Sequence, residues 1–416
     1  MPFKPIKSDH DTIKKVKELN YISIGVFANK AIISIALFLI AKYFGSEVFG
    51  EYAYYQSILA ALYPFAILGM ENFLLIEKTR TDTVNSFIFN HCIFIGAILL
   101  VYYAAQSGSF NWILLLIPFN LALMTLFDVL ISNLIVKKHF IRNIQISLFF
   151  SVFTLFLQAV FFLLFERDVF YIILAGLISY LLPLAYYALK PEDGGIVFCI
   201  SLKKYKNFFL KNYRYILHYL LLTSADSFLL FIPVYFVKKS FSLEDVGTYF
   251  LCTKIFTFPI TIIGVSLSRY FLVEMANDDK SSKNIMFFVY VSLILSLSIY
   301  GLIYFLNDMS LFSYLLGSGW KNIHEIINVS LIRYAIEFFS YPFIGIFLIL
   351  HKQSTLVTIK ILLISFLAVL LTVTEFDSFI QMIQTINLCM GLFYIFLIFV
   401  SFIYLRKLTN TSPQKV

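Results

Sequence analysis

The segment that decides the fold is residues 21–41, YISIGVFANKAIISIALFLIA, an apolar run with Asn29 and Lys30 at its centre. A helix of about 20 residues, rising 1.5 Å per residue, spans the roughly 30 Å hydrocarbon core of a bilayer. Lys30 is therefore expected deep in the membrane, where a lysine costs roughly 2.5–3.5 kcal/mol on insertion. An ionisable residue at that depth predicts either a functional site or a structural ion pair.

Similar apolar runs recur along the whole chain. Hydrophobic residues make up 60% of the 416 residues, charged residues make up 13%, and the mean hydropathy is +0.86. Backbone groups in lipid must be bonded within the protein, so long continuous runs predict helices rather than the alternating segments of a barrel. The sequence predicts an all-α polytopic membrane protein with about 12 transmembrane helices, at 21–41, 53–76, 86–105, 112–135, 144–165, 169–188, 215–236, 247–268, 285–306, 326–349, 357–374 and 379–404.

The first run follows a polar lead of 20 residues and has no small-residue cleavage site behind it, so we expect it to stay in the protein.

The basic residues in the connections indicate how the chain is oriented in the membrane. One set of alternate connections carries 23 Lys and Arg residues, and the other carries only Lys42, Arg167, Lys238, Lys239 and Lys321. The positive-inside rule therefore places both termini in the cytoplasm. Basic loops against anionic lipid headgroups also account for the pI near 9.0, without any role for nucleic acid.

A few charged residues fall inside the predicted spans. Arg333 and Glu337 are spaced i, i+4 and can pair along one helix face. We discount Lys360, which lies three residues from a cytoplasmic end and can snorkel to the interface. Others have no such local partner, so they must face one another across helices or face water in a cavity: Lys30, Lys254, Asp128 and Asp226.

A short internal repeat relates two halves of the chain. Residues 47–52, EVFGEY, align with residues 244–249, EDVGTY, at an offset of 197, and the same offset places Asn29 on Asp226. Six spans separate the copies, so the halves would have the same orientation, as parallel repeats around a central cavity. We expect two six-helix bundles, residues 1–200 and 201–416, joined through a basic cytoplasmic connection.

Several stretches of the chain resemble a known family. Residues 21–23 (YIS), 43–52 (YFGSEVFGEY) and 68–71 (LGME), together with 315–320 (LLGSGW) before the tenth span, are similar to segments of Wzx-type polysaccharide and O-antigen flippases. These flippases belong to the multidrug/oligosaccharidyl-lipid/polysaccharide (MOP) exporter superfamily. Chain length, span number and repeated halves agree with the resemblance, which covers nearly the whole chain.

The resemblance implies alternating access and the flipping of undecaprenyl-pyrophosphate-linked oligosaccharide units from the cytoplasmic to the periplasmic leaflet of a bacterial inner membrane. Such units serve the synthesis of O-antigen, a part of lipopolysaccharide, or of other surface polysaccharides. A polysaccharide polymerase and a chain-length regulator are the implied partners beside membrane lipids. The related lipid II flippases are similar in carrying basic residues on helices one and eight, where Lys30 and Lys254 lie. Asn29 stands where those relatives lead us to expect a carboxylate, which makes lipid II itself a less favoured cargo.

An ammonium group can bind phosphate without a fixed geometry. The charged residues within the predicted spans can therefore be assigned roles in binding the cargo. We predict a pyrophosphate path made of Lys30, Lys254 and Arg333. We predict that the polar or coupling residues of the cavity are Asn29, Asp128, Asp226 and Glu337. A Lys30–Asp226 ion pair that holds the halves together is the structural alternative.

The sequence gives little support for an enzymatic function. No His-Glu-x-x-His, Cys-x-x-Cys, P-loop or dinucleotide-binding motif is present, so we expect no cofactor and no metal site. A polysaccharide polymerase is the alternative from another class, although such enzymes resemble one another in having large periplasmic loops and the longest outer connection predicted here, 307–325, is about 19 residues. A cation-coupled drug exporter of the same superfamily is the third interpretation, and it would favour acidic sites.

Overall fold

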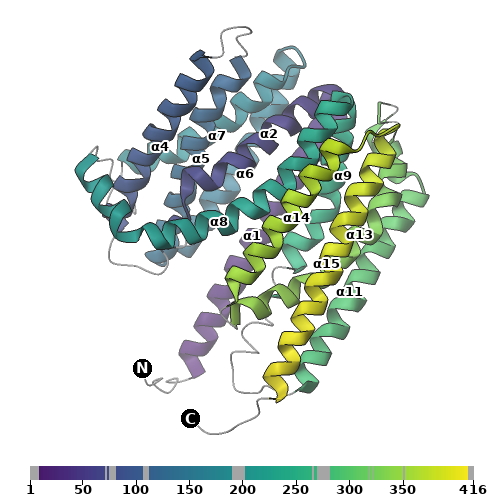
Figure 1. Cartoon of the computed structure of the whole chain (residues 1–416). Coiled ribbons are helices and arrows are strands. Elements are labelled where there is room, and N and C mark those ends of the chain that lie inside the picture. The colour runs from purple at the N-terminus through teal and green to yellow at the C-terminus, as the bar shows by residue number, and fades with distance from the viewer. Residues whose placement is uncertain are drawn as a thin grey trace. The chain divides into compact units, whose positions relative to one another are not determined.

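The computed structural model describes residues 9–70, 73–74, 81–105, 112–189, 202–264, 267–268, 282–317, 319–320, 322–349 and 352–410. Within these ranges every regular element is a helix (Figure 1). The helices are α1 (Asp9–Phe44), α2 (Ser46–Ile67), α4 (Thr81–Ala105), α5 (Trp112–Val136), α6 (Phe140–Leu164), α7 (Val169–Leu189), α8 (Leu202–Ser240), α9 (Leu243–Pro259), the π-helix η2 (Ile260–Gly264), α11 (Ser282–Asp308), α12 (Leu311–Leu316), α13 (Ile323–Ile349), α14 (Gln353–Val373) and α15 (Phe379–Asn410).

Each of the twelve predicted spans overlaps one of these helices, which confirms the all-α polytopic fold class. Among the described residues, 9 helices are long and apolar enough to cross a membrane, and α4 contributes a shorter apolar stretch, Val84–Leu99. The short helix α12 lies in a connection for which the sequence predicted no element. The chain is a multi-pass membrane protein.

The predicted second span, 53–76, departs from a continuous helix. Helix α2 ends at Ile67, and Leu68 and Gly69 adopt left-handed conformations with φ of 51° and 68°. A Cβ on Gly69 would overlap the Tyr219 side chain, so glycine meets both a backbone and a packing requirement there. Hydropathy over 53–76 gave no sign of this turn, because most of these residues are apolar and hydropathy does not report backbone geometry.

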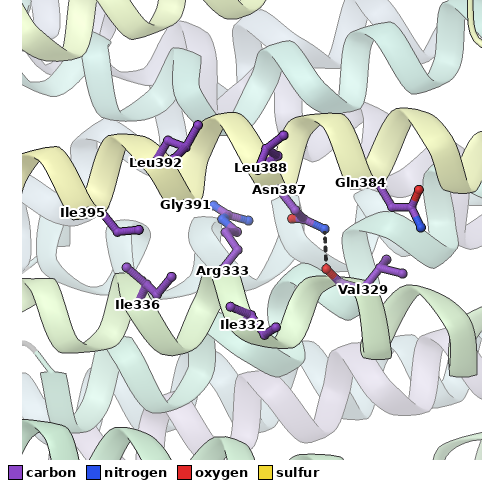
Figure 2. A pocket seen from close by; sticks show the side chains of 10 residues that line it. All are labelled: Val329, Ile332, Arg333, Ile336, Gln384, Asn387, Leu388, Gly391, Leu392 and Ile395. Carbon is purple, nitrogen blue, oxygen red and sulfur yellow. Dashed lines mark hydrogen bonds between the residues drawn. The ribbon is translucent and has the colours of Figure 1, made fainter.

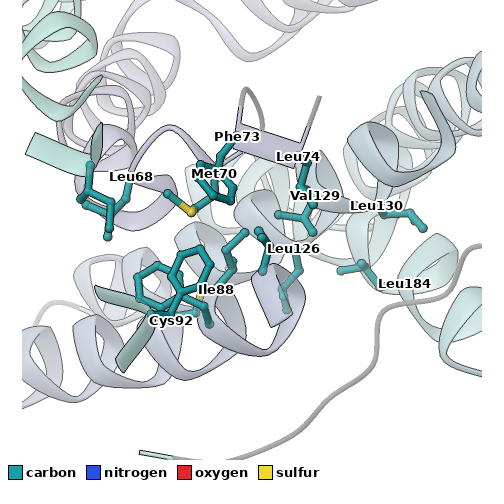
Figure 3. Packing of buried hydrophobic residues seen from close by; sticks show 14 of the residues in the cluster. Leu68, Met70, Phe73, Leu74, Ile88, Cys92, Leu126, Val129, Leu130 and Leu184 are labelled. Carbon is teal, nitrogen blue, oxygen red and sulfur yellow. The ribbon is translucent and has the colours of Figure 1, made fainter. Parts of the chain in front are cut away.

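Two compact units emerge from the contacts of the described residues. One comprises 1–37 and 58–224, and the other comprises 38–57 and 225–416. The division into bundles at residue 200 stays a prediction. In the first unit, α5 packs against α4, α6 and α7. Its core, seen in Figure 3, joins the segment after α2 to α4 and α5 through Leu68, Met70, Ile88 and Leu130.

In the second unit, α13 is the central helix. It packs against α15, α11 and α9, and Figure 1 shows α11, α13 and α15 running side by side. Phe256 of α9 stacks on Tyr334 of α13, with ring centroids 4.6 Å apart, and Tyr300 of α11 donates a hydrogen bond of 3.0 Å to the Phe256 carbonyl. These contacts hold the C-terminal end of α9 against α11 and α13, close to several charged side chains.

The two copies of the internal repeat meet within the second unit. The start of α2 crosses the start of α9 so closely that a Cβ on Gly50 would overlap the Leu243 carbonyl oxygen, and a Cβ on Gly247 would overlap the Ser46 carbonyl oxygen. Gly50 and Gly247 are equivalent at the offset of 197. Phe49, one residue before Gly50, packs edge-on against Trp320, with ring centroids 5.6 Å apart. The repeat thus marks a close helix crossing that only glycine permits.

Candidate functional site

The second unit contains a cavity of about 440 Å³ inside its helix bundle. Its walls come from α8, α9, η2, α13, α14 and α15, and most of the lining is apolar or aromatic. Four of the seven residues proposed from the sequence lie on these walls: Asp226, Lys254, Arg333 and Glu337. The fold therefore brings together charges that the sequence places on three separate helices.

Two ion pairs neutralise part of this charge. Arg333 Nη2 lies 3.0 Å from Glu337 Oε2 along one face of α13, which confirms the predicted i, i+4 pair. Lys360 Nζ of α14 lies 2.5 Å from Asp226 Oδ1 of α8. Lys360 was discounted as a snorkelling residue, and this was wrong. Helix α14 begins at Gln353 rather than near residue 357, so Lys360 sits two turns inside the helix and is buried.

Lys254 is the third cation of the cavity. Its side chain is exposed on α9, and its Nζ lies 4.7 Å from the centroid of the Phe250 ring, within cation–π range. The lining thus carries three cations and two carboxylates, counted from its residues. By count, the lining therefore carries one more positive side chain than negative ones.

The backbone beside this charge is irregular. Helix α9 ends at Pro259, and the five residues that follow form the π-helix η2. Ile260 and Thr261 of this segment line the cavity. Proline cannot donate a backbone hydrogen bond, and single π turns within helices occur frequently at functional sites. The proline was visible in the sequence, but the π turn was not predicted.

The remaining three proposed residues lie in the first unit, where they make two sets of polar contacts. Tyr63 Oη of α2 donates a hydrogen bond to Asp128 Oδ2 of α5, and the nearby Lys30 ammonium of α1 attracts the same carboxylate. Ser151 Oγ of α6 donates a hydrogen bond to Asn29 Oδ1. Lys30 itself is exposed. Asp128 thus has its partners on other helices, as the sequence analysis expects of a charge without a local partner. The sequence analysis missed Tyr63 and Ser151 as hydrogen-bond donors to Asp128 and Asn29, because both resemble ordinary lipid-facing or core residues.

Comparison with family models and with curated proteins finds no match. Solved structures do match. The lipid II flippase MurJ in an inward closed conformation aligns with a TM-score of 0.68 over 95% of this chain and 93% of that chain, at 15% identity. An outward-facing multidrug resistance MATE transporter of the MOP superfamily aligns with a TM-score of 0.62 over 96% of this chain and 97% of that chain, at 11% identity.

A third match is a MOP superfamily transporter from Pyrococcus furiosus, with a TM-score of 0.54 over 95% of this chain and 96% of that chain, at 12% identity. Identities this low establish a shared fold rather than a shared substrate. All three neighbours are transporters or flippases, and each is covered almost end to end. The chain therefore shares its helical fold with these three transporters.

Proposed function

We propose that this protein flips undecaprenyl-pyrophosphate-linked oligosaccharide units from the cytoplasmic to the periplasmic leaflet of a bacterial inner membrane, with both termini in the cytoplasm. The observation that carries the proposal is the cavity of the second unit, where Lys254, Arg333 and Lys360 outnumber Asp226 and Glu337. A polysaccharide polymerase and a chain-length regulator would act on the translocated units.

The negative charge of its pyrophosphate distinguishes this cargo from organic cations. A pyrophosphate must cross a region of low dielectric, where an isolated charge is expensive unless it meets an opposite one. Internal pairing with Asp226 and Glu337 moderates the positive charge of the cavity, so that an anion can be bound and then released. In the first unit, we assign Lys30 to the same phosphate path, with Asp128 orienting it or coupling transport to a cation gradient.

Alternative cargoes fit the cavity less well. An exporter of organic cations needs a surplus of negative charge, and the cavity of the second unit has the opposite balance. A membrane polymerase would have to use a transporter fold for glycosyl transfer. The apolar and aromatic walls that surround the charges suit a lipid-linked amphiphile, with Thr253, Thr257 and Tyr394 offering groups for hydrogen bonds to sugar.

Genetic complementation tests the proposal. In a strain that lacks the gene, Lys254→Ala and Lys30→Ala should each restore surface polysaccharide at least about tenfold less than the wild-type protein, since each removes one cation from the phosphate path. Lipid-linked units should accumulate on the cytoplasmic side. Lys239→Ala and Lys42→Ala, which remove exposed charges at helix ends, are matched controls and should restore wild-type levels.

Expression of each variant is checked by quantifying the protein in isolated membranes. Full restoration by both Lys254→Ala and Lys30→Ala at normal expression would rule out the phosphate path. Single repeat units at the surface of the null strain would indicate a polymerase instead, and a change in drug sensitivity alone would indicate an exporter.

A further inference from the structure

A second concavity lies on the face of α13 and α15, outside the charged cavity. It is a groove of about 340 Å³, which we call the α13/α15 groove, with walls of Ile332 and Ile336 from α13 and of Leu388, Leu392 and Ile395 from α15 (Figure 2). Ile332 and Leu388 are 71% and 64% exposed. On a membrane protein such exposed apolar side chains face lipid, so the groove is open to hydrocarbon chains.

The floor of this groove is polar. Arg333 lines both the groove and the charged cavity, and Figure 2 shows its side chain reaching from α13 toward α15 beside Gly391. The residue is only 5% exposed. One guanidinium nitrogen pairs with Glu337, but Nε and Nη1 make no hydrogen bond. Buried donors without partners are costly, and an anionic oxygen would satisfy them with charge-assisted hydrogen bonds.

The position of Arg333 along α13 restricts what such an anion can be. Arg333 follows the first residue of α13, Ile323, by ten residues. At 1.5 Å per residue this is about 15 Å from the end of the helix, and about 10 Å from residue 326, where the predicted membrane span begins. A resident phospholipid keeps its phosphate at the membrane interface, so its headgroup does not reach this depth. A lipid whose phosphate crosses the membrane does.

We propose that the α13/α15 groove holds the phosphate-proximal part of the isoprenoid chain of the cargo lipid while its pyrophosphate passes Arg333. This inference rests on the proposed function, because only a lipid in transit brings its phosphate to this depth. The exposed walls of the groove let the rest of the chain remain in the bilayer. Arg333 then serves the charged cavity and the groove at once.

Photo-crosslinking tests the occupant. The probe is undecaprenyl pyrophosphate without sugar, carrying a diazirine on an isoprene unit near the pyrophosphate, added to the purified full-length protein in detergent. Mass spectrometry should map crosslinks to Ile332, Leu388 or Leu392. Gly391→Leu fills the groove, since a Cβ at Gly391 meets nothing within 4 Å, and should reduce these crosslinks about tenfold. Gly301→Leu on α11, where the added Cβ also has open space, is the matched control and should leave them unchanged.

Leu388→Trp, which covers the groove from an exposed rim position, gives a second reduction independent of Gly391. Crosslinks that persist in both groove variants, or that excess dioleoyl phosphatidylglycerol removes as efficiently as unlabelled undecaprenyl pyrophosphate, would overturn the groove proposal. Wild-type labelling in the charged cavity but not in the groove would overturn it while leaving the proposed function intact. If the probe labels the wild-type protein at neither place, the result would contradict both the groove proposal and the proposed function.

Discussion

The ion pair between Asp226 and Lys360 joins two side chains with very different access to water. The Asp226 side chain is 58% exposed, whereas the Lys360 side chain is 9% exposed. A buried ammonium without its counter-ion is expensive, and an exposed carboxylate without its partner is not. The pair therefore stabilises the protein mainly because Asp226 offsets the free-energy cost of burying the Lys360 ammonium.

This asymmetry predicts unequal effects of removing either partner. Asp226→Asn should lower the free energy of unfolding by roughly 1–3 kcal/mol, less than for a fully buried pair because Asp226 has access to water. Lys360→Met keeps an apolar chain of similar length and should cost less than about 1 kcal/mol. Thermal unfolding of the purified proteins in detergent measures both, and the double variant should resemble Lys360→Met. A larger loss in Lys360→Met than in Asp226→Asn would contradict this account.

Much of the candidate site followed from the cost of charge in a membrane. That cost singled out Lys30, Asp128, Asp226 and Lys254, and helical spacing alone identified the Arg333 pair. The partners of Asp128 and Asp226 could not be predicted, because they depend on how each helix is rotated about its axis. Lys360 was missed because hydropathy placed the start of its helix four residues too late.

At the scale of helices, the crossing of α2 and α9 depends on two glycines. At Gly50 and Gly247 the two backbones approach so closely that even a methyl group has no room. The internal repeat in the sequence identified both positions as equivalent but did not reveal that they touch, since sequence similarity carries no distance. The crossing gives a physical reason for glycine at both positions.

Gly50→Ala and Gly247→Ala should each destabilise the protein by about 1–3 kcal/mol, the usual cost of overpacking, because the new methyl group displaces the backbone of the other helix. Gly301→Ala, on α11 with open space around its Cβ, should be neutral or stabilising by up to about 1 kcal/mol through helix propensity. Unfolding midpoints of the three variants in detergent check this. Equal midpoints for Gly50→Ala and Gly301→Ala would show that the crossing tolerates a side chain.

At the scale of the whole molecule, length and hydropathy were sufficient to predict the helical architecture, since each apolar run became a helix. The interruption after α2 and the π turn after α9 were not predicted, because local backbone geometry leaves hydropathy unchanged. The basic bias of alternate connections predicts which ends face the cytoplasm. Reporter fusions at either terminus should be active only if the reporter functions in the cytoplasm, and periplasmic activity at either end would reverse the proposed orientation.

The central claim is that the protein moves a pyrophosphate-linked oligosaccharide across a bilayer. The most direct test uses proteoliposomes containing the lipid-linked oligosaccharide that accumulates in the strain lacking the gene, labelled with a nitrobenzoxadiazole dye on its sugar. Dithionite bleaches only the outer leaflet, and the assay is run with and without sodium and proton gradients. We predict that the wild-type protein and Gly301→Leu expose inner-leaflet label to bleaching, and that Lys254→Ala does so at least about tenfold more slowly. Bleaching by the wild-type protein no greater than in protein-free vesicles under every gradient would contradict the claim.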